Sequence, residues 1–474
     1  IILFATLGSL TYGYCTSIIA TTLGQPSFLA YIGLDTAPNA TQLIGAINGL
    51  YQAGGLLGTI LVGVLGDWLG RKYAIFCSAC LCILGGALQT GSVHIAMFMV
   101  ARLLTGFSIG ALVTLIPLWQ SEMAPPETRG LLVGLHGVFI LIGYTTASWV
   151  GVGFYFVHDN SVSWRVPLAL QLVFPLALAA GVLFLPESPR WLVERGRSEE
   201  SLTILKQIHG ETFAEQEFKQ MSRQIELEKT LPSSWGSIFT IPSYRKRALI
   251  GFACMFFAQG TGTQVINNYG PTLYESLGYG KAQQLMLSAG WITVGIFANI
   301  LDAILLDRVG RKWLMTTGLA LTGLALLCEV VLLAVAAGSK AGSAAAVAFL
   351  YLHICFYGST LDASTYVYAA EIWPTHLRAR GCAISTSGLF VSSLILLISA
   401  SDAFAAIKWR YYLVFLSMTA VGVFVFAFFF PETRGVSLEE IAKQFGDQVV
   451  DVHLDDCALD GDDCEQGYDI QGKE

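Results

Sequence analysis

The sequence predicts an all-α membrane protein with twelve transmembrane helices in two six-helix halves. Of its 474 residues, 54% are hydrophobic and only 13% are charged, about half the charged share of an ordinary soluble domain. The mean hydropathy is +0.60. Such a chain has too little polar surface to cover itself in water, so most of it is expected to lie in lipid. A charged loop occurs twice, at matching places, which predicts that the two halves are a duplication.

Twelve apolar runs approach the length of about 20 residues that a helix needs to cross a hydrocarbon core of about 30 Å. They cover residues 1–23, 43–65, 73–91, 95–119, 131–156, 166–185, 248–274, 284–306, 313–336, 344–372, 381–400 and 410–430. The interval between the sixth and seventh runs is rich in Glu, Lys, Gln and Arg, and is expected to form short amphipathic helices. We therefore divide the chain into an N-terminal bundle (1–185), a linker (186–247), a C-terminal bundle (248–430) and an acidic tail (431–474).

Lys and Arg are distributed unequally over the loops. If the loop 66–72 faces the cytosol, the polar segments on the same side hold 21 of the 27 Lys and Arg residues. This asymmetry follows the positive-inside rule, so we expect a multi-pass protein of the plasma membrane with both termini in the cytosol. The sequon at Asn39 then lies in the first outside loop, where a glycan could be attached. The chain begins at Ile1 inside an apolar run and without Met, so we expect further residues before it.

Three pairs of charged motifs repeat between the halves in the same order, at offsets of 240 to 249 residues. The loop Gly66–Lys72 pairs with Asp307–Lys312, Glu122–Gly130 with Glu371–Gly381, and Pro186–Arg190 with Pro431–Gly435. Arg can bind a carboxylate bidentately, so these motifs are expected to latch helix ends together when the cytosolic side is closed. The alternative is that they only anchor loops. The candidate gating residues are Asp67, Arg71, Glu122, Arg129, Glu187, Arg190, Asp307, Arg311, Glu371, Arg378, Glu432 and Arg434.

These motifs resemble those of the sugar porters of the major facilitator superfamily, and the segment Ala369–Arg378 is similar to the fungal branch. The resemblance covers nearly the whole chain except the acidic tail. It implies a six-plus-six bundle with a central cavity, and movement of a sugar or related small polar solute by alternating access. Two alternatives stay open: a nutrient sensor on a transporter scaffold, and a porter of the same superfamily for a non-sugar solute.

Polar side chains in the seventh span are the first candidates for solute binding, because polar groups inside a membrane are costly and usually functional. Gln259, Thr263 and Asn267 fall on one stripe at helical spacing, and Gln264 and Asn268 lie beside it. Amides both donate and accept hydrogen bonds, which suits the hydroxyls of a polyol. The resemblance also implies sugar-binding amides in this span.

The tenth span supplies Asp362 and Tyr366 on one face, and Tyr12 of the first span completes the candidate set. A carboxylate at Asp362 could accept sugar hydroxyls, carry a proton or pair with a neighbouring helix. Gly137 and Gly295 stand where the resemblance implies a sugar-binding Gln and Asn. With fewer hydrogen-bonding side chains, the site is expected to favour a solute that is less polar, larger or differently shaped than a common hexose.

Proton coupling is the next question, because proton-coupled relatives carry an Asp at the position of Cys15 that pairs with an Arg, here Arg102. A thiol is a far weaker acid than a carboxyl group and cannot replace it as a proton carrier. Either transport is uncoupled from protons, or another acid carries the proton, with Asp362 as the candidate. His136 is a third coupling candidate, although a packed, hydrogen-bonded role is the simpler interpretation.

Two further expectations concern packing and charge. Glycines at four-residue spacing predict close approach of helix backbones. They are Gly54 and Gly58, Gly106 and Gly110, and Gly130 and Gly134. Asp302 precedes Asp307 by five residues and is expected to join the cytosolic charge network.

The sequence contains no pattern typical of an enzyme or of a nucleic-acid-binding protein. No metal-ligand cluster, nucleophile–base pair or phosphate-binding loop is visible. We therefore expect no enzymatic activity, no cofactor, no bound metal and no nucleic-acid partner. The expected partners are a small-molecule solute, the lipid bilayer and, if Asp362 titrates during transport, protons.

Overall fold

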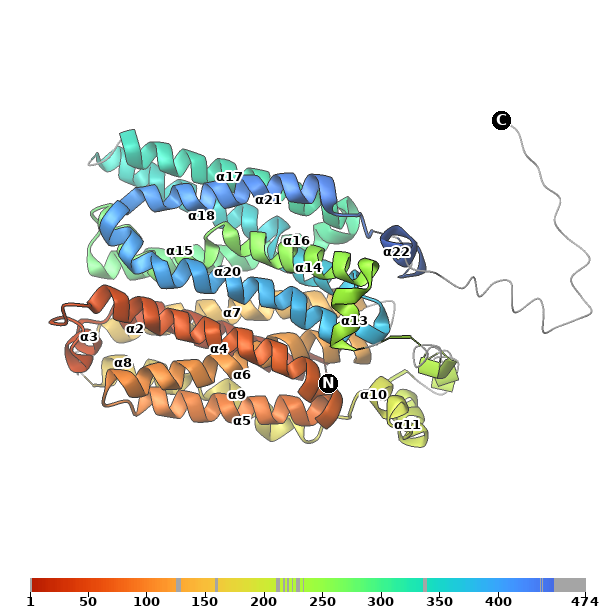
Figure 1. The fold of residues 1–474 in the computed structure, drawn as a ribbon. Coiled ribbons are helices and arrows are strands. Elements are labelled where there is room, and N and C mark those ends of the chain that lie inside the picture. The colour runs from red at the N-terminus through yellow and green to blue at the C-terminus, as the bar shows by residue number, and fades with distance from the viewer. Residues whose placement is uncertain are drawn as a thin grey trace, which may run out of the picture.

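The computed structural model describes residues 2–124, 129–157, 161–209, 234–335, 339–434 and 438–446, with isolated residues between 214 and 232 and residue 436. These residues form helices and no strand. Eleven stretches of them are long and apolar enough to cross a membrane. The longest, Arg378–Phe429, contains two antiparallel helices joined by a short turn (Figure 1). Counted separately, these two give the twelve crossings that the sequence predicts.

The helices of the N-terminal half carry the first six crossings. They are α1 (Ile2–Ala5), α2 (Leu7–Leu23), α3 (Pro26–Ile32), α4 (Ala40–Leu69), α5 (Arg71–Thr90), α6 (Ile95–Met123), α7 (Arg129–Tyr155), α8 (Val162–Leu170) and α9 (Val173–Val182). The C-terminal half follows with α14 (Pro242–Gly260), α15 (Thr263–Ser276), α16 (Lys281–Val309), α17 (Arg311–Val335), α18 (Lys340–Thr360), α19 (Asp362–Glu371), η1 (Thr375–Leu377), α20 (Arg378–Ile407), η2 (Lys408–Tyr411) and α21 (Tyr412–Phe429). The two halves lie side by side, with α4 against α20 and α7 against α16 (Figure 1).

The repeated charged loops form the same turn in both halves. Gly70 ends α4 with φ +87°, and Gly310 ends α16 with φ +100°. L-residues with a Cβ rarely adopt such angles, so glycine allows the tight reversal into α5 and α17. Both turns lie at one end of the bundle, which we call the latch end. The opposite end, where α3 and η2 lie, is the far end (Figure 1).

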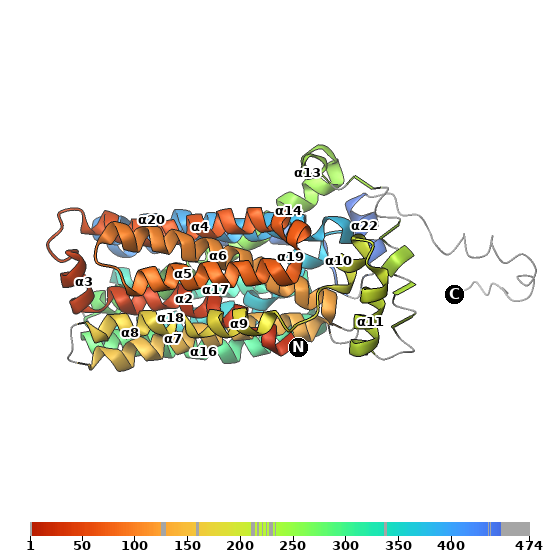
Figure 2. The same ribbon diagram turned by 90° about the horizontal axis from the view of Figure 1, so that it is seen from below.

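Short helices outside the bundle gather at the latch end. They are α10 (Pro189–Glu194), α11 (Ser198–His209), α13 (Trp235–Thr240) and α22 (Leu438–Phe445). The second view shows α10, α11 and α22 beyond the ends of the long helices and α13 at the side of the bundle (Figure 2). The short linker helices expected from the sequence are therefore present among the described residues. Ser437, which the sequence suggests as an N-cap for the last helix, lies outside the described residues. The division of the chain into bundles, linker and tail at residues 185, 247 and 430 remains a proposal.

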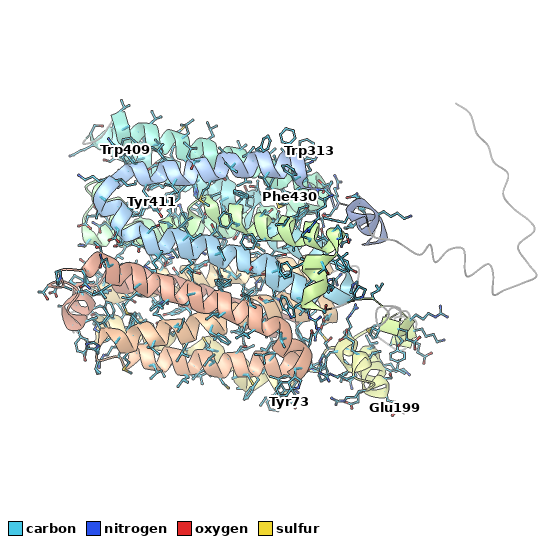
Figure 3. All side chains as sticks on the ribbon, viewed as in Figure 1. Tyr73, Glu199, Trp313, Trp409, Tyr411 and Phe430 are labelled. Carbon is cyan, nitrogen blue, oxygen red and sulfur yellow. The ribbon has the colours of Figure 1, made fainter. Side chains whose placement is uncertain are left out.

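Aromatic side chains mark both ends of the bundle. Tyr73 and Trp313 project near the latch end, and Trp409 lies near the far end (Figure 3). Tyr73 and Trp313 are exposed, and each carries the ammonium of the preceding lysine over its ring, at 5.9 Å from the centroid. Aromatic rings near the ends of a transmembrane bundle, next to cationic side chains, are typical of the two membrane–water interfaces.

Two crossings of the C-terminal half are broken near their middle. Between α14 and α15 the chain passes through Thr261 and Gly262, and Gly262 has φ +79°. Between α18 and α19 the break is at Leu361. Non-helical backbone at membrane depth is tolerated where it is buried in protein or lines a cavity. The sequence analysis treated both crossings as continuous helices, which the structure corrects.

Close backbone approach is confirmed between α4 and α6. A Cβ added to Gly58 would lie 1.9 Å from the carbonyl oxygen of Phe107, and one added to Gly106 would lie 2.0 Å from that of Tyr51. Gly54 and Gly110 are equally confined. The expectation is wrong for Gly134, whose added Cβ would meet nothing closer than 3.8 Å.

Candidate functional site

A small central cavity of about 30 Å³ lies where the two halves meet. The broken helices provide much of its wall: α15 begins beside it with Thr263, and α19 begins beside it with Asp362. Seven of the eight candidate solute-binding residues line it: Tyr12, Gln259, Thr263, Gln264, Asn267, Asp362 and Tyr366. The cavity has room for a water molecule or two and must widen before a sugar can enter.

The amide side chains around this cavity are only partly hydrogen-bonded. The Nε2 of Gln264 donates to the hydroxyl of Tyr144 at 2.8 Å, across the junction of the halves. The Nε2 of Gln259 donates to the hydroxyl of Tyr357 at 3.2 Å. Among the described residues, the Oε1 atoms of both glutamines and the Nδ2 of Asn267 have no partner. Buried polar atoms usually have one, so these groups are available to the hydroxyls of a solute.

Asn268 does not line the central cavity. Its Nδ2 donates to the carbonyl of Gln264 in its own helix at 2.9 Å, and its side chain borders a second cavity of about 320 Å³ toward the far end. This outer cavity lies between α2 and α4 of one half and α15, α16 and α20 of the other. Its volume falls in the range of small-molecule pockets. Asn268 lies one turn beyond Gln264 on α15, so the seventh crossing borders two cavities at different depths.

Asp362 is the one carboxylate that lines the central cavity. Asn299 of α16 donates to its Oδ2 at 2.7 Å. Asp302, one turn along α16, instead accepts hydrogen bonds from the backbone N–H groups of Ala363 and Ser364, at 2.9 and 3.0 Å, and from the Ser364 hydroxyl. Asp302 thus satisfies free N–H groups at the start of α19. The expectation that Asp302 belongs to the charge network of the latch end is wrong.

The coupling candidates of the N-terminal half are held by uncharged groups. Arg102 donates from Nη1 to the backbone carbonyl of Cys15 at 3.1 Å, and its guanidinium lies 4.0 Å from the ring centroid of Tyr51. Within the described part of the chain, no ion pair involves Arg102. His136 is buried, with Nδ1 2.7 Å from the Ser9 hydroxyl. Neither residue lines the central cavity.

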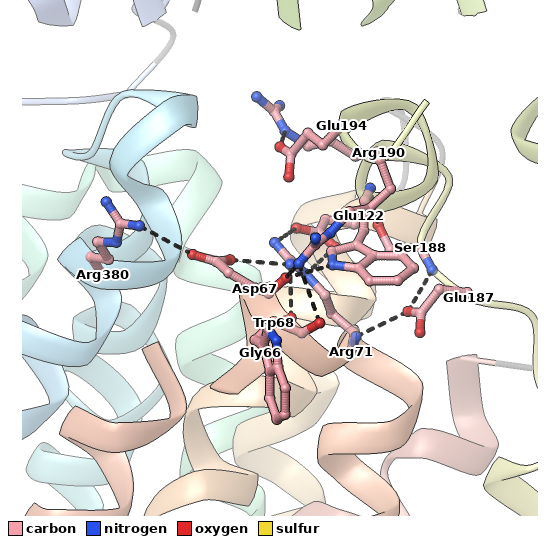
Figure 4. A network of polar contacts seen from close by, with 12 residues as sticks. Gly66, Asp67, Trp68, Arg71, Glu122, Glu187, Ser188, Arg190, Glu194 and Arg380 are labelled. Atoms are coloured by element: carbon pink, nitrogen blue, oxygen red, sulfur yellow. Dashed lines mark hydrogen bonds and ion pairs between the residues drawn. The ribbon is translucent and has the colours of Figure 1, made fainter. Parts of the chain in front are cut away.

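The latch-end network of the first half centres on Arg71. Its guanidinium binds Glu122 through two hydrogen bonds of 3.1 Å and Asp67 through one of 3.2 Å (Figure 4). Glu187 accepts from the backbone N–H groups of Arg71 and Lys72, at 3.0 and 3.2 Å. Burial raises the pKa of Glu187, and hydrogen bonds from the backbone N–H groups of Ser188 and Lys72 oppose the rise. The network joins α4, α5 and α6 to the chain that leaves α9.

The second half repeats the main contacts of this arrangement. Arg311 binds Glu371 at 2.9 and 3.2 Å, and Glu432 accepts from the backbone N–H groups of Arg311 and Lys312, at 2.9 and 3.1 Å. Thr433 adds a hydroxyl bond of 2.8 Å to Glu371, which the sequence analysis missed. A duplicated ion-pair network is what the repeated motifs predict. Its role in gating remains a proposal.

The other gating candidates lie at the edges of these networks. Arg190 pairs with Glu194 at 3.5 Å (Figure 4), Arg378 begins α20, and the backbone N–H of Arg434 donates to Glu432 at 3.0 Å. The side chains of Arg129 and Asp307 lie outside the described residues. Sequence reasoning missed Arg380 of α20, whose guanidinium lies 3.7 Å from Asp67 of α4 and so connects the two halves (Figure 4).

Sequence reasoning also missed part of the wall of the central cavity. Tyr144, Trp291 and Tyr357 are not among the candidates chosen from the sequence, yet all three line the cavity. An aromatic residue inside a transmembrane span gives no sequence signal that separates a cavity wall from a packed interface. For Tyr144, the one available hint of a place in the cavity wall was its position on a crossing that faces the other half.

Comparison with known proteins adds a family and a fold. A family model described as "Sugar (and other) transporter" matches residues 1–445. The MFS-type transporter criB of Aspergillus cristatus is 33% identical over 450 residues, which cover 94% of this chain and 92% of criB. The sugar transporter STL1 of Saccharomyces cerevisiae is 30% identical over 463 residues, which cover 92% of this chain and 80% of STL1.

Among solved structures, the proton:xylose symporter XylE, bound to 6-bromo-6-deoxy-D-glucose, superposes with a TM-score of 0.82. The alignment has 22% sequence identity and covers 94% of this chain and 98% of the XylE chain. At this identity the likeness shows the fold, which agrees with the two six-helix halves that the sequence predicts.

Proposed function

Because the chain belongs to the family of sugar (and other) transporters, we propose that it moves a sugar or related small polar solute across the membrane by alternating access. The observation that carries this proposal is the central cavity at the junction of the halves, with amide atoms that have no hydrogen-bond partner among the described residues. A site at that junction can face either side of the membrane as the halves rock. The solute would bind through Gln259, Gln264 and Asn267.

The two ends of the bundle support the same mechanism. At the latch end, ion pairs join helix ends within each half, and Arg380–Asp67 joins the halves. Toward the far end, the outer cavity lies next to the solute candidates of α15. We infer that the latch end is closed in this conformation and that the solute enters through the outer cavity. Opening of the latch would then release it on the other side.

We further propose that the latch end faces the cytosol of a plasma-membrane protein, with both termini on that side. The excess of Lys and Arg in the loops of the latch end supports this orientation. Asn39 is exposed and precedes α4 at the far end, where it would be accessible for glycosylation.

Transport is proposed to be uncoupled from protons. The position of Cys15 offers Arg102 a backbone carbonyl in place of a carboxylate, so this pair has no acid that could load and release a proton. We expect saturable uptake of a labelled sugar or polyol into proteoliposomes at a rate that changes less than about twofold when an inward proton gradient is imposed.

The same assay can contradict each part of the proposal. Accumulation that the gradient drives in the parent, and that Asp362→Asn abolishes, would make Asp362 the proton carrier and overturn uncoupled transport. Absence of uptake for every sugar and polyol tested, with the protein folded in the vesicles, would overturn the assignment of the substrate class.

A further inference from the structure

The central cavity contains a carboxyl group with no cationic partner. Among the described residues, its lining contains the carboxyl group of Asp362 and no Lys, Arg or His. The hydrogen bond to Asp362 comes from the neutral amide of Asn299, and no ion pair involves this acid within the described part of the chain. A carboxylate that leaves water without a positive partner is costly. A bound ligand that brings a positive charge would remove much of that cost.

Two features of the local structure favour an anion at this place, and the neighbouring carboxyl group of Asp302 opposes one. Asp362 is the first residue of α19, and its carboxylate lies where the helix dipole favours an anion. The amide hydrogen bond from Asn299 acts in the same direction. Asp302 satisfies the N–H groups of Ala363 and Ser364, so those donors do not tie down the Asp362 carboxylate, which remains at the cavity wall.

Aromatic rings surround the same space. Tyr12, Tyr144, Trp291, Tyr357 and Tyr366 come from α2, α7, α16, α18 and α19 and all line the cavity. The hydroxyls of Tyr144 and Tyr357 are already engaged by Gln264 and Gln259, and the indole N–H of Trp291 donates to the Leu350 carbonyl at 2.8 Å. Since their polar atoms are occupied, these three side chains offer mainly ring surface, and ring faces attract cations.

We propose that the solute is a polyhydroxylated molecule with one protonated amine, such as an amino sugar. Its ammonium group would bind Asp362 among the aromatic rings, and its hydroxyls would bind the free amide atoms of Gln259, Gln264 and Asn267. A cavity lined by charge of one sign also concentrates ligands of the opposite sign. This inference rests on the proposed function and narrows its substrate class from small polar solutes to cationic ones.

The test compares three sugars of similar shape on the purified full chain. Glucosamine is positively charged at about pH 6, because primary amines of this kind titrate above that pH, whereas glucose and N-acetylglucosamine are neutral. We expect glucosamine to bind about tenfold or more tightly than either neutral sugar in calorimetric titrations. Proteoliposome uptake should follow the same order.

Two variants locate the effect. Asp362→Asn should remove the preference, so that glucosamine and glucose bind this variant with affinities within about threefold of each other. The matched control is Glu275→Gln, which neutralises a carboxylate of the outer cavity that already pairs with Lys281 at 3.7 Å. This control should keep the preference.

The outcomes separate the inference from the function on which it rests. Equal affinity of the parent for glucosamine and glucose would overturn the cationic substrate class and leave sugar transport standing, whether or not the variants fold. A preference that survives in Asp362→Asn would overturn the role of this carboxylate. If the folded parent neither binds nor transports any of the three sugars, the proposed function itself is contradicted.

Discussion

Replacing Arg71 by Met is expected to lower the initial rate of solute uptake by tenfold or more. The side chain of Arg71 is 4% exposed and that of its partner Glu122 is 7% exposed. Loss of the guanidinium leaves the Glu122 carboxylate buried without its bidentate partner and releases Asp67. Removing one member of a buried ion pair typically costs about 3–5 kcal/mol. The closed latch would lose that stabilisation, and the protein would accumulate in the conformation that is open at the latch end.

The matched control is Arg380→Met. The Arg380–Asp67 pair is longer, at 3.7 Å, and its side chains are 25% and 36% exposed. Exposed pairs contribute about 0–1 kcal/mol, so uptake should stay within about twofold of the parent. Uptake into proteoliposomes and thermal unfolding of the purified protein measure both variants. Equal damage from the two replacements would show that the contact between halves, and not the buried network, holds the latch.

Replacing Gly106 by Ala is expected to destabilise the protein by about 1–3 kcal/mol or more, since overpacking of a tight interface costs that much. The new Cβ would lie 2.0 Å from the carbonyl oxygen of Tyr51, which belongs to the backbone of α4 and cannot rotate away. Helices α4 and α6 would have to separate. The gain in helix propensity from Gly to Ala, about 1 kcal/mol, offsets only part of this.

Gly134→Ala is the control for Gly106→Ala. It adds the same methyl group to a transmembrane helix, but the nearest heavy atom is 3.8 Å away, on Ala303. This variant should keep the melting temperature of the parent or raise it slightly. The midpoint of thermal unfolding and the yield of monodisperse protein measure both changes. A similar melting temperature for the two variants would contradict tight α4–α6 packing.

The duplicated network could be predicted from sequence because each motif is local and occurs twice. The pairs Arg71–Glu122 and Arg311–Glu371 join residues that both stand in such motifs. Arg380 could not be chosen in this way, since its partner Asp67 belongs to the other half. Contacts between halves depend on how the two bundles pack, and a single sequence carries no direct signal of that.

The solute candidates show a second limit of sequence reasoning. Helical periodicity grouped Gln259, Thr263 and Asn267 correctly around one cavity, but it placed Asn268 beside them although that side chain borders the outer cavity. The cause is that Asn268 lies one turn further along α15 than Gln264, and helical periodicity gives the face of a residue but not the depth at which a cavity ends. Asp302 was misassigned because it is close to Asp307 in sequence. Its real partners are the backbone N–H groups at the start of α19, which are far from Asp302 in sequence.

The most direct test of the central claim is the concentration dependence of solute uptake in Gln264→Ala beside Gln283→Ala. Gln264 lines the central cavity with a free Oε1 atom, whereas Gln283 is exposed near the far end. Loss of one hydrogen bond to the solute, about 0.5–1.5 kcal/mol, predicts a KM about three- to tenfold higher for Gln264→Ala and an unchanged KM for Gln283→Ala. An unchanged KM in Gln264→Ala would contradict a solute site at the junction of the halves.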